Sequence, residues 1–182
     1  MSSRPSSSPR SESRVRAFLE TPRLGLREVG AGDVEAFYQL DGDASVMRYI
    51  ADGAVGTREA ATAAVARAMR YYALYPGLGK WVAEERSSGR FVGWFSLNYV
   101  PKTVEVEVGY RLLPFAWGRG LATEGARALV RHGFGSVGLY RIIGLTHAEN
   151  LASQRVLQKA GLRPAGTGRY YERELRLFVA PA

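Results

Sequence analysis

The chain has 182 residues, of which 46% are hydrophobic and 23% are charged, and this size predicts one domain around one core. It contains no cysteine, which excludes disulfides, thiolate metal ligands and a cysteine nucleophile, and with only two histidines we expect no metal site. The net charge of +8 favours an acidic ligand such as a phosphate or RNA, or else reflects a solvated basic surface.

The N-terminal segment differs in composition from the rest of the chain. Residues 1–17 are dominated by serine, proline and arginine, so we predict a disordered tail there rather than a signal peptide or a membrane anchor. Residues 18–182 are predicted to form a single domain. No apolar run approaches the roughly 20 residues of a membrane-spanning helix, and we expect no membrane partner and a cytoplasmic location.

The first part of this domain is predicted to hold one strand and three helices. Alternating side chains predict a strand at Arg23–Val29, and Asp33 is well placed to cap the helix that follows. A short helix is expected around Met47. Thr57 is expected to cap a longer, alanine-rich helix that runs to Tyr72.

Three strands are predicted next, joined as an antiparallel meander. The first two are Lys80–Glu84 and Arg90–Leu97, separated by a Ser-Ser-Gly turn. In the third, Val104–Leu112, valine alternates strictly with glutamate, which is typical of a half-buried strand. Gly93 lies inside the second strand and predicts a bulge or a close approach of two backbones.

A glycine-bearing loop follows the third of these strands. Gly118 and Gly120 allow main-chain N–H groups to approach a ligand just before a helix begins at Leu121, so the loop is a candidate anion site. Two known glycine fingerprints do not fit it. The dinucleotide-binding motif requires glycine where the chain has Thr123, and the phosphate-binding loop of nucleoside triphosphatases requires lysine where it has Ala126.

The helix that begins at Leu121 is expected to run to about Phe134, where glycines become frequent. A strand is predicted at Leu139–Thr146. Since a helix links it to Val104–Leu112, we expect these two strands to be parallel neighbours.

The C-terminal part is predicted to hold one helix and two strands. Asn150 is expected to cap a helix at Leu151–Lys159. The segment Leu162–Val179 is expected to supply two strands, and the turn between them fits either Gly166-Thr167-Gly168 or Glu172-Arg173.

Three sequence blocks, in this order and at this spacing, resemble one known superfamily. The blocks are Glu107-Val108-Gly109-Tyr110, then Trp117-Gly118-Arg119-Gly120-Leu121-Ala122-Thr123-Glu124, then Asn150-x-x-Ser153-x-x-Val156-Leu157-x-Lys159-x-Gly161-Leu162. Through them the chain is similar to the GNAT acyl-CoA N-acyltransferases, and most similar to the RimJ/RimL type, which acetylates N-terminal α-amines of ribosomal proteins. The resemblance runs from about Glu20 to Val179.

This resemblance implies the fold and the co-substrate. The fold would be the α/β (α+β) GNAT fold, a mixed and mostly antiparallel central sheet of about seven strands with flanking helices and a splayed parallel pair at strands 4 and 5. The co-substrate would be acetyl-CoA, with no metal. The residues implied in binding it are Leu112, Leu113, Trp117, Gly118, Arg119, Gly120, Leu121, Ala122, Asn150 and Ser153.

Within that set the resemblance assigns different parts of coenzyme A to different residues. The loop from Trp117 to Ala122 would hold the pyrophosphate through main-chain N–H groups, with Arg119 as an added cation. The pantetheine arm would lie along the free edge of the strand near Leu112. Asn150 either contacts the pantetheine arm or the substrate, or is a plain helix cap.

The resemblance also implies the catalytic groups. Glu107 matches the position of the base that takes a proton from the acceptor ammonium, and Glu105, two residues away on the same face, is its rival. Many relatives carry a tyrosine where this chain has Leu157, and in the RimJ/RimL branch the serine at Ser153 is the partner of the thiol. Ser153 would act as the acid or would only orient the sulfur, since a thiol with a pKa near 8.5 gains little from an acid.

Three functions are compatible with the sequence. The first is an acetyl-CoA-dependent N-acetyltransferase that acts on a protein N-terminal α-amine, including those of ribosomal proteins, or on a small amine, by direct attack in a ternary complex. The second is a catalytically silent acyl-CoA sensor, and the third is a basic module that associates with the ribosome or RNA. We expect a monomer or a homodimer.

Overall fold

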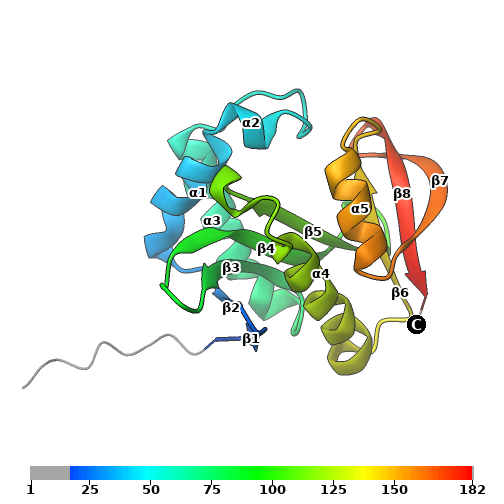
Figure 1. Ribbon diagram of the computed structural model, residues 1–182, viewed down its shortest axis with the longest axis horizontal. Helices are drawn as coiled ribbons and strands as arrows, with labels where there is room; N and C mark the ends of the chain where they lie inside the picture. The colour runs from blue at the N-terminus through cyan, green and yellow to red at the C-terminus, as the bar shows by residue number, and fades with distance from the viewer. Residues whose placement is uncertain (1–16, 182) are drawn as a thin grey trace, which may run out of the picture.

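The computed structural model describes residues 17–181, so the predicted tail lies almost entirely outside the described residues (Figure 1). A mixed sheet of eight strands forms its centre, in the spatial order β1-β2-β3-β4-β5-β6-β8-β7. The strands are β1 (Leu19–Glu20), β2 (Leu24–Glu28), β3 (Gly79–Glu85), β4 (Phe91–Tyr99), β5 (Val106–Leu112), β6 (Arg141–Thr146), β7 (Arg163–Tyr170) and β8 (Arg173–Pro181). The predicted mixed, mostly antiparallel sheet is confirmed. The additional strand is β1, which at two residues is too short to show an alternating pattern.

Strands β2 to β5 form an antiparallel meander, as predicted. Gly93 lies both at a close approach of two backbones and beside a bulge, the two features predicted for it. A Cβ at this position, where φ is 146°, would lie 2.1 Å from the main-chain oxygen of Arg111 on β5. The pairing of β3 with β4 shifts register between Ala83 and Glu84, directly beside it. Only glycine lets β4 and β5 approach so closely at the end of β5.

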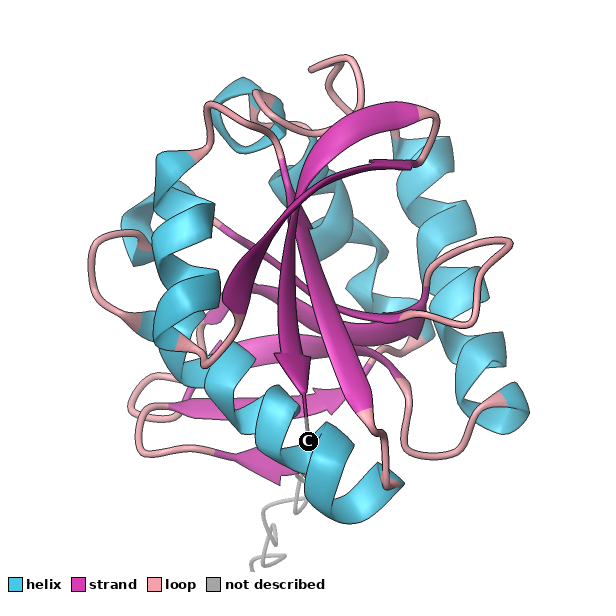
Figure 2. Cartoon of the chain, turned by 90° about the vertical axis from the view of Figure 1, so that its right-hand side faces the viewer, coloured by secondary structure: helices cyan, strands magenta, loops and turns pink. Residues whose placement is uncertain are grey.

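Strands β5 and β6 are parallel, as predicted, but they pair at a single position, Glu107 opposite Ile143. Beyond it the two strands diverge. Figure 2 shows the result: β6 and β8 stand upright in front, whereas the meander strands run across behind them. The part of β5 that follows Glu107 therefore has a strand neighbour on one side only, which is β4.

The C-terminal hairpin turns at Tyr171 and Glu172, which decides between the two turn positions that the sequence left open. Both residues have a left-handed backbone, with φ of 50° and 62°. Gly166, the other candidate, has φ of 91° and lies where the β7–β8 register shifts between Pro164 and Thr167. It marks a bulge rather than the turn.

Helices cover both faces of the sheet. They are α1 (Val34–Asp41), α2 (Ala44–Met47), α3 (Arg58–Leu74), α4 (Leu121–His132) and α5 (Leu151–Lys159), with a 3-10 turn at Ala31–Asp33, another at Pro114–Ala116, and a π-helical turn at Gly133–Val137 that continues α4. The helix predicted to begin at Leu121 thus ends close to the expected residue, and Leu151–Lys159 is confirmed.

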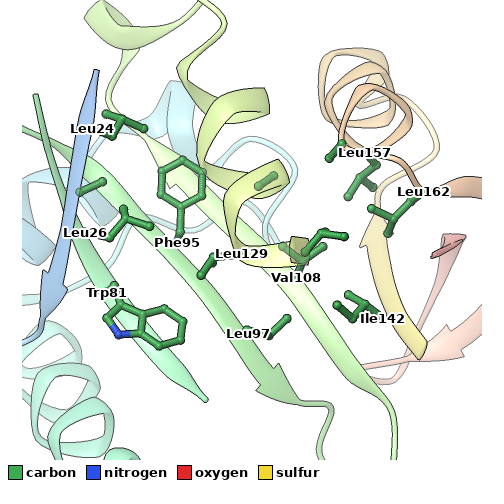
Figure 3. Close-up of a cluster of buried hydrophobic side chains, with 14 of the residues drawn as sticks. Leu24, Leu26, Trp81, Phe95, Leu97, Val108, Leu129, Ile142, Leu157 and Leu162 are labelled. Atoms are coloured by element: carbon green, nitrogen blue, oxygen red, sulfur yellow. The ribbon is translucent and has the colours of Figure 1, made fainter. Parts of the chain in front are cut away.

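One face of the sheet packs against α4 and α5. Figure 3 shows this core, in which Phe95 and Leu97 of β4 and Val108 of β5 lie against Leu129 of α4. The other face packs against α1 and α3, where Trp94 of β4 joins a second buried cluster with side chains of these helices. Strand residues alternate between the two clusters because successive side chains point to opposite faces.

Two predicted helix caps have different outcomes. The Thr57 hydroxyl accepts a hydrogen bond from the main-chain N–H of Ala60 at 3.2 Å, so it caps α3 as predicted. Asp33 precedes α1 but makes no side-chain cap. Its carboxylate instead accepts bonds from the Gly30 N–H at 2.7 Å and from the Arg27 guanidinium at 2.8 and 2.9 Å. A charged partner from β2 outcompetes the helix amides there.

Within residues 17–181 no helix is both long enough and apolar enough to cross a bilayer. The same part of the chain contains no cluster of three or more histidine, aspartate and glutamate side chains that could hold a metal ion.

Gly125 tests the packing of α4 on the sheet. Alanine is the better helix former, but a Cβ at Gly125 would lie 2.3 Å from the ring of Phe95, which is fully buried. We expect Gly125→Ala to lower the free energy of unfolding by about 1–3 kcal/mol in urea denaturation. Gly135→Ala is the control, since a Cβ there would have no atom within 4 Å. A Gly125→Ala protein as stable as the wild type would contradict this packing.

Candidate active site

The loop between β5 and α4 exposes main-chain N–H groups, as the sequence predicted. Gly118 and Gly120 have φ of 71° and 77°, a left-handed conformation that costs glycine little. None of the N–H groups from Gly118 to Thr123 donates a hydrogen bond to an acceptor within residues 17–181, and residues 117–120 are exposed. These free donors lie at the positive end of the α4 dipole, an arrangement that can bind a phosphate group.

The two other predicted polar groups of the loop are already engaged. The Arg119 guanidinium pairs with Glu85 at the end of β3, and its main-chain oxygen accepts a bond from Arg23 at 2.7 Å. The Trp117 indole N–H donates to the main-chain oxygen of Leu112 at 2.7 Å. The predicted anion site thus has main-chain amides as its free donors, and the Arg119 charge is shared with a carboxylate.

The loop continues into the free edge of β5. The Leu113 N–H donates to the Val92 oxygen of β4 at 2.9 Å, so Leu113 belongs to the β4 ladder. Because hydrogen-bonding directions alternate along a strand, the N–H of Leu112 points to the other side, where β6 has diverged. Leu112 and Leu113 were both implied in binding coenzyme A, and the structure brings the N–H of Leu112, not that of Leu113, to the gap.

Glu107 lies on β5, on the face that packs against α1 and α3, and it is partly buried. The Tyr171 hydroxyl donates to its Oε2 at 2.6 Å. Burial raises the pKa of Glu107 to about 7, although the bonds from Tyr171 and from the Leu145 amide and the charge of Lys80 act to lower it. A carboxylate with a pKa near neutrality can accept a proton and release it again. Its rival Glu105 pairs with Arg141 at 3.3 Å.

A cationic side chain lies on the same face of the sheet as Glu107 and was missed in the sequence. Lys80 of β3 lies with its Nζ 3.7 Å from the centroid of the Trp94 ring. Burial, followed by the charge of Arg111, lowers the pKa of Lys80 to about 7. Arg111 in turn pairs with Asp41 of α1. The signal was a lysine at the start of the predicted strand Lys80–Glu84, but only the register of β3 to β5 shows that it shares a face with Glu107.

Asn150 and Ser153 lie on α5 on the opposite side of β5. The Asn150 side chain accepts a bond from the Ser153 N–H at 3.0 Å, so it caps α5 as predicted. The Tyr110 hydroxyl donates to the Ser153 main-chain oxygen at 3.0 Å and lies 3.0 Å from the Ser153 Oγ. The phenol has one proton, and it goes to the Ser153 main-chain oxygen. The Ser153 hydroxyl therefore donates its own proton to the Tyr110 oxygen. Tyr110 was quoted in the sequence only as part of a motif, with no role.

Burial raises the pKa of Tyr110, so its hydroxyl keeps its proton at neutral pH. Leu157, at the position where many relatives have tyrosine, is fully buried against the core and carries no polar group toward the gap. Polar chemistry on this face of β5 thus comes from Tyr110 and Ser153.

A family model for the acetyltransferase (GNAT) domain matches residues 23–163, most of the chain. The chain belongs to this family. The acetyl donor of GNAT acetyltransferases is acetyl-CoA, which is the co-substrate that the resemblance implied. The eight-stranded sheet with its one parallel pair is the GNAT fold.

Known proteins similar to this GNAT chain include an enzyme from a fungus and a bacterial protein. It is 38% identical over 152 residues to the FsC-acetyl coenzyme A-N(2)-transacetylase of Aspergillus fumigatus. The match covers 79% of this chain and 64% of the fungal protein, so the chain spans less than two thirds of the length of that relative. It is 31% identical over 158 residues to the uncharacterized N-acetyltransferase YoaA of Bacillus subtilis, and this match covers 85% of this chain and 87% of YoaA.

The GNAT fold of the chain is also similar to that of Mycobacterium smegmatis RimJ, solved in complex with a CoA-disulfide. The TM-score is 0.71 at 24% sequence identity, and the match covers 87% of this chain and 82% of RimJ.

Substitutions at Asn150 test its role as the cap of α5. Asn150→Ala removes the acceptor of the Ser153 N–H, and we expect it to lower the free energy of unfolding by about 1 kcal/mol. Asn150→Asp keeps an equally good cap and should retain the wild-type stability. Urea denaturation of the wild type and of the two variants measures both free energies of unfolding against that of the wild type. Equal stability of Asn150→Ala and the wild type would show that the cap contributes nothing.

Proposed function

We propose that this chain transfers the acetyl group of acetyl-CoA to a primary amine by direct attack in a ternary complex. The observation that carries the proposal is the arrangement along β5. Free main-chain amides at Gly118 to Thr123 follow its end, the N–H of Leu112 lies on an edge with no neighbouring strand, and Glu107 lies on the face away from α4. Groups for binding, charge stabilisation and proton removal thus converge on the gap between β5 and β6.

The amide loop binds the diphosphate of coenzyme A. A diphosphate gains from several N–H donors at once and from the helix dipole, and these bonds are charge-assisted. The residues of the loop are Trp117, Gly118, Arg119, Gly120, Leu121 and Ala122. From there the pantetheine arm follows the unpaired edge of β5, on the side of Tyr110 and Ser153, and the thioester reaches the gap near Leu112.

Glu107 takes the proton of the attacking amine, directly or through water. The amine nitrogen bonds to the acetyl carbon, the carbon–sulfur bond breaks, and one N–H proton passes to the carboxylate. The Leu112 N–H stabilises negative charge on the carbonyl oxygen. The thiolate leaves as a weak base, and the Ser153 hydroxyl, held by Tyr110, orients it rather than acting as a strong acid.

The pKa of Glu107 favours an α-amine as the acceptor. An α-ammonium has a pKa of about 7.7–8.0, close to the value of about 7 for Glu107, whereas a lysine side chain has about 10.4. The base is thus matched to a protein N-terminus or to a small amine of similar acidity. This is the acceptor chemistry of the RimJ/RimL branch, and ribosomal protein N-termini are the first peptides to test.

An acceptor panel tests this choice. With acetyl-CoA at pH 7, we expect coenzyme A release to show a kcat/KM about 100-fold higher for a peptide with a free α-amine than for the same peptide with a blocked N-terminus and one lysine, because far more of the α-amine is uncharged. Small amines with a pKa near 8 belong in the same panel. Equal rates for the two peptides would contradict an α-amine acceptor, and no release with any amine would favour an acyl-CoA sensor.

Glu107→Gln tests the base. The carboxylate acts when ionised, so the wild-type kcat/KM should rise as the pH passes about 7. Glutamine cannot accept the proton, and we expect a loss of at least about 10²-fold near pH 7 that shrinks above the pKa of the acceptor. Glu105→Gln is the matched control and should keep the wild-type profile. If Glu105→Gln loses the rate and Glu107→Gln does not, the two roles are reversed.

A further inference from the structure

The turn of the β7–β8 hairpin reaches Glu107 from another part of the chain. The hairpin adds to the sheet through β8, which pairs with β6, and Figure 1 shows it on the far side of β6 from β5. Its turn residue Tyr171 nonetheless donates its hydroxyl to Glu107 Oε2 at 2.6 Å. The bond therefore bridges the two diverging halves of the sheet across the gap.

The backbone of this turn has an unusual conformation for its sequence. Tyr170 pairs with Arg173, so Tyr171 and Glu172 form a two-residue turn, and both have positive φ. Turns of this kind strongly prefer Asn-Gly or Asp-Gly, because bulky residues are strained there. A tyrosine at this position persists only where its surroundings hold it in place, and such strain gathers at functional sites.

We propose that Tyr171 is a positioning residue for Glu107, which fixes the orientation of the carboxylate and favours its ionised form. The proposal rests on the proposed role of Glu107 as the base and adds the β7–β8 turn to the acceptor side of the site. Tyr171 is half exposed, so it lies where an acceptor that approaches Glu107 from solvent meets the protein.

Three groups from three parts of the chain act on the Glu107 carboxylate. Lys80 on β3 attracts its negative charge, and the main-chain amide of Leu145 on β6 donates toward it. Tyr171 is the one side chain of residues 17–181 that forms a direct hydrogen bond with it. Burial and the neighbouring Glu107 raise the pKa of Tyr171, so its hydroxyl stays protonated and remains a donor.

The direction of the effect follows from the bond. A donor to the ionised carboxylate lowers the pKa of that carboxyl, and removal of the donor raises it. Tyr171→Phe keeps the ring and loses the hydroxyl, so the pKa of Glu107 should rise by about one pH unit. The rise of kcat/KM with pH should move to higher pH by the same amount, whereas the rate on the high-pH plateau should change little. A purely structural role of Tyr171 would lower the rate at every pH alike.

The experiment follows the Glu107 carboxyl by ¹³C NMR during a pH titration of the full chain, with the Glu107→Gln protein to assign its signal, and records pH–rate profiles of the same proteins. Tyr170→Phe is the matched control, because Tyr170 is the adjacent residue on β7 and makes no bond to Glu107. Tyr171→Asn is the second variant. Asparagine tolerates positive φ and should fold even if Tyr171→Phe does not, but it is too short to reach Glu107.

A pKa and a pH profile that both shift upward in Tyr171→Phe or Tyr171→Asn, but not in Tyr170→Phe, support the proposal. An unshifted Glu107 titration in both Tyr171 variants overturns it, as does a shifted titration with an unmoved pH profile. The proposed function fails in a different way: Glu107→Gln would then keep the pH profile of the wild type, whatever the Tyr171 variants show.

Discussion

The site depends on the divergence of two parallel strands. Strands β5 and β6 pair only where Glu107 lies opposite Ile143, and past that point the main chain of β5 has an unpaired edge. Unpaired peptide groups inside a protein are costly, so such an edge persists where a ligand or water satisfies it. The adjoining loop adds free N–H groups from Gly118 to Thr123. Under the proposed function, these groups and the N–H of Leu112 are the main-chain donors for an extended, anionic ligand.

The alternation of β5 divides the chemistry between two faces. Tyr110 points toward α5, where it holds Ser153, and this face suits the thioester arm. Glu107 points to the other face, toward Lys80, Asp41 and Arg111, and burial shifts the pKa values of Lys80 and Glu107 toward neutrality there. In the proposed reaction, this one strand presents a co-substrate side and an acceptor side next to the point where it diverges from β6.

Local sequence patterns predicted the elements well, but they could not predict contacts across the fold. Alternation identified β3 to β5, and the cap at Asn150 and the glycine loop are local features that depend on a few neighbouring residues. The bond between Glu107 and Tyr171 joins residues 64 positions apart and needs the β7–β8 turn, which the sequence left undecided. Tyr171 and Glu172, the two left-handed residues of this turn, are not residue types that favour a left-handed turn.

Diphosphate binding by main-chain amides at the start of α4 underlies the proposed function. Isothermal titration calorimetry of the purified chain compares coenzyme A with pantetheine, which lacks the diphosphate and the adenosine 3′-phosphate joined to it. We expect coenzyme A to bind and pantetheine to bind roughly 100-fold more weakly, since several charge-assisted hydrogen bonds are lost. Equal affinity for the two compounds, or no heat with coenzyme A, would contradict it.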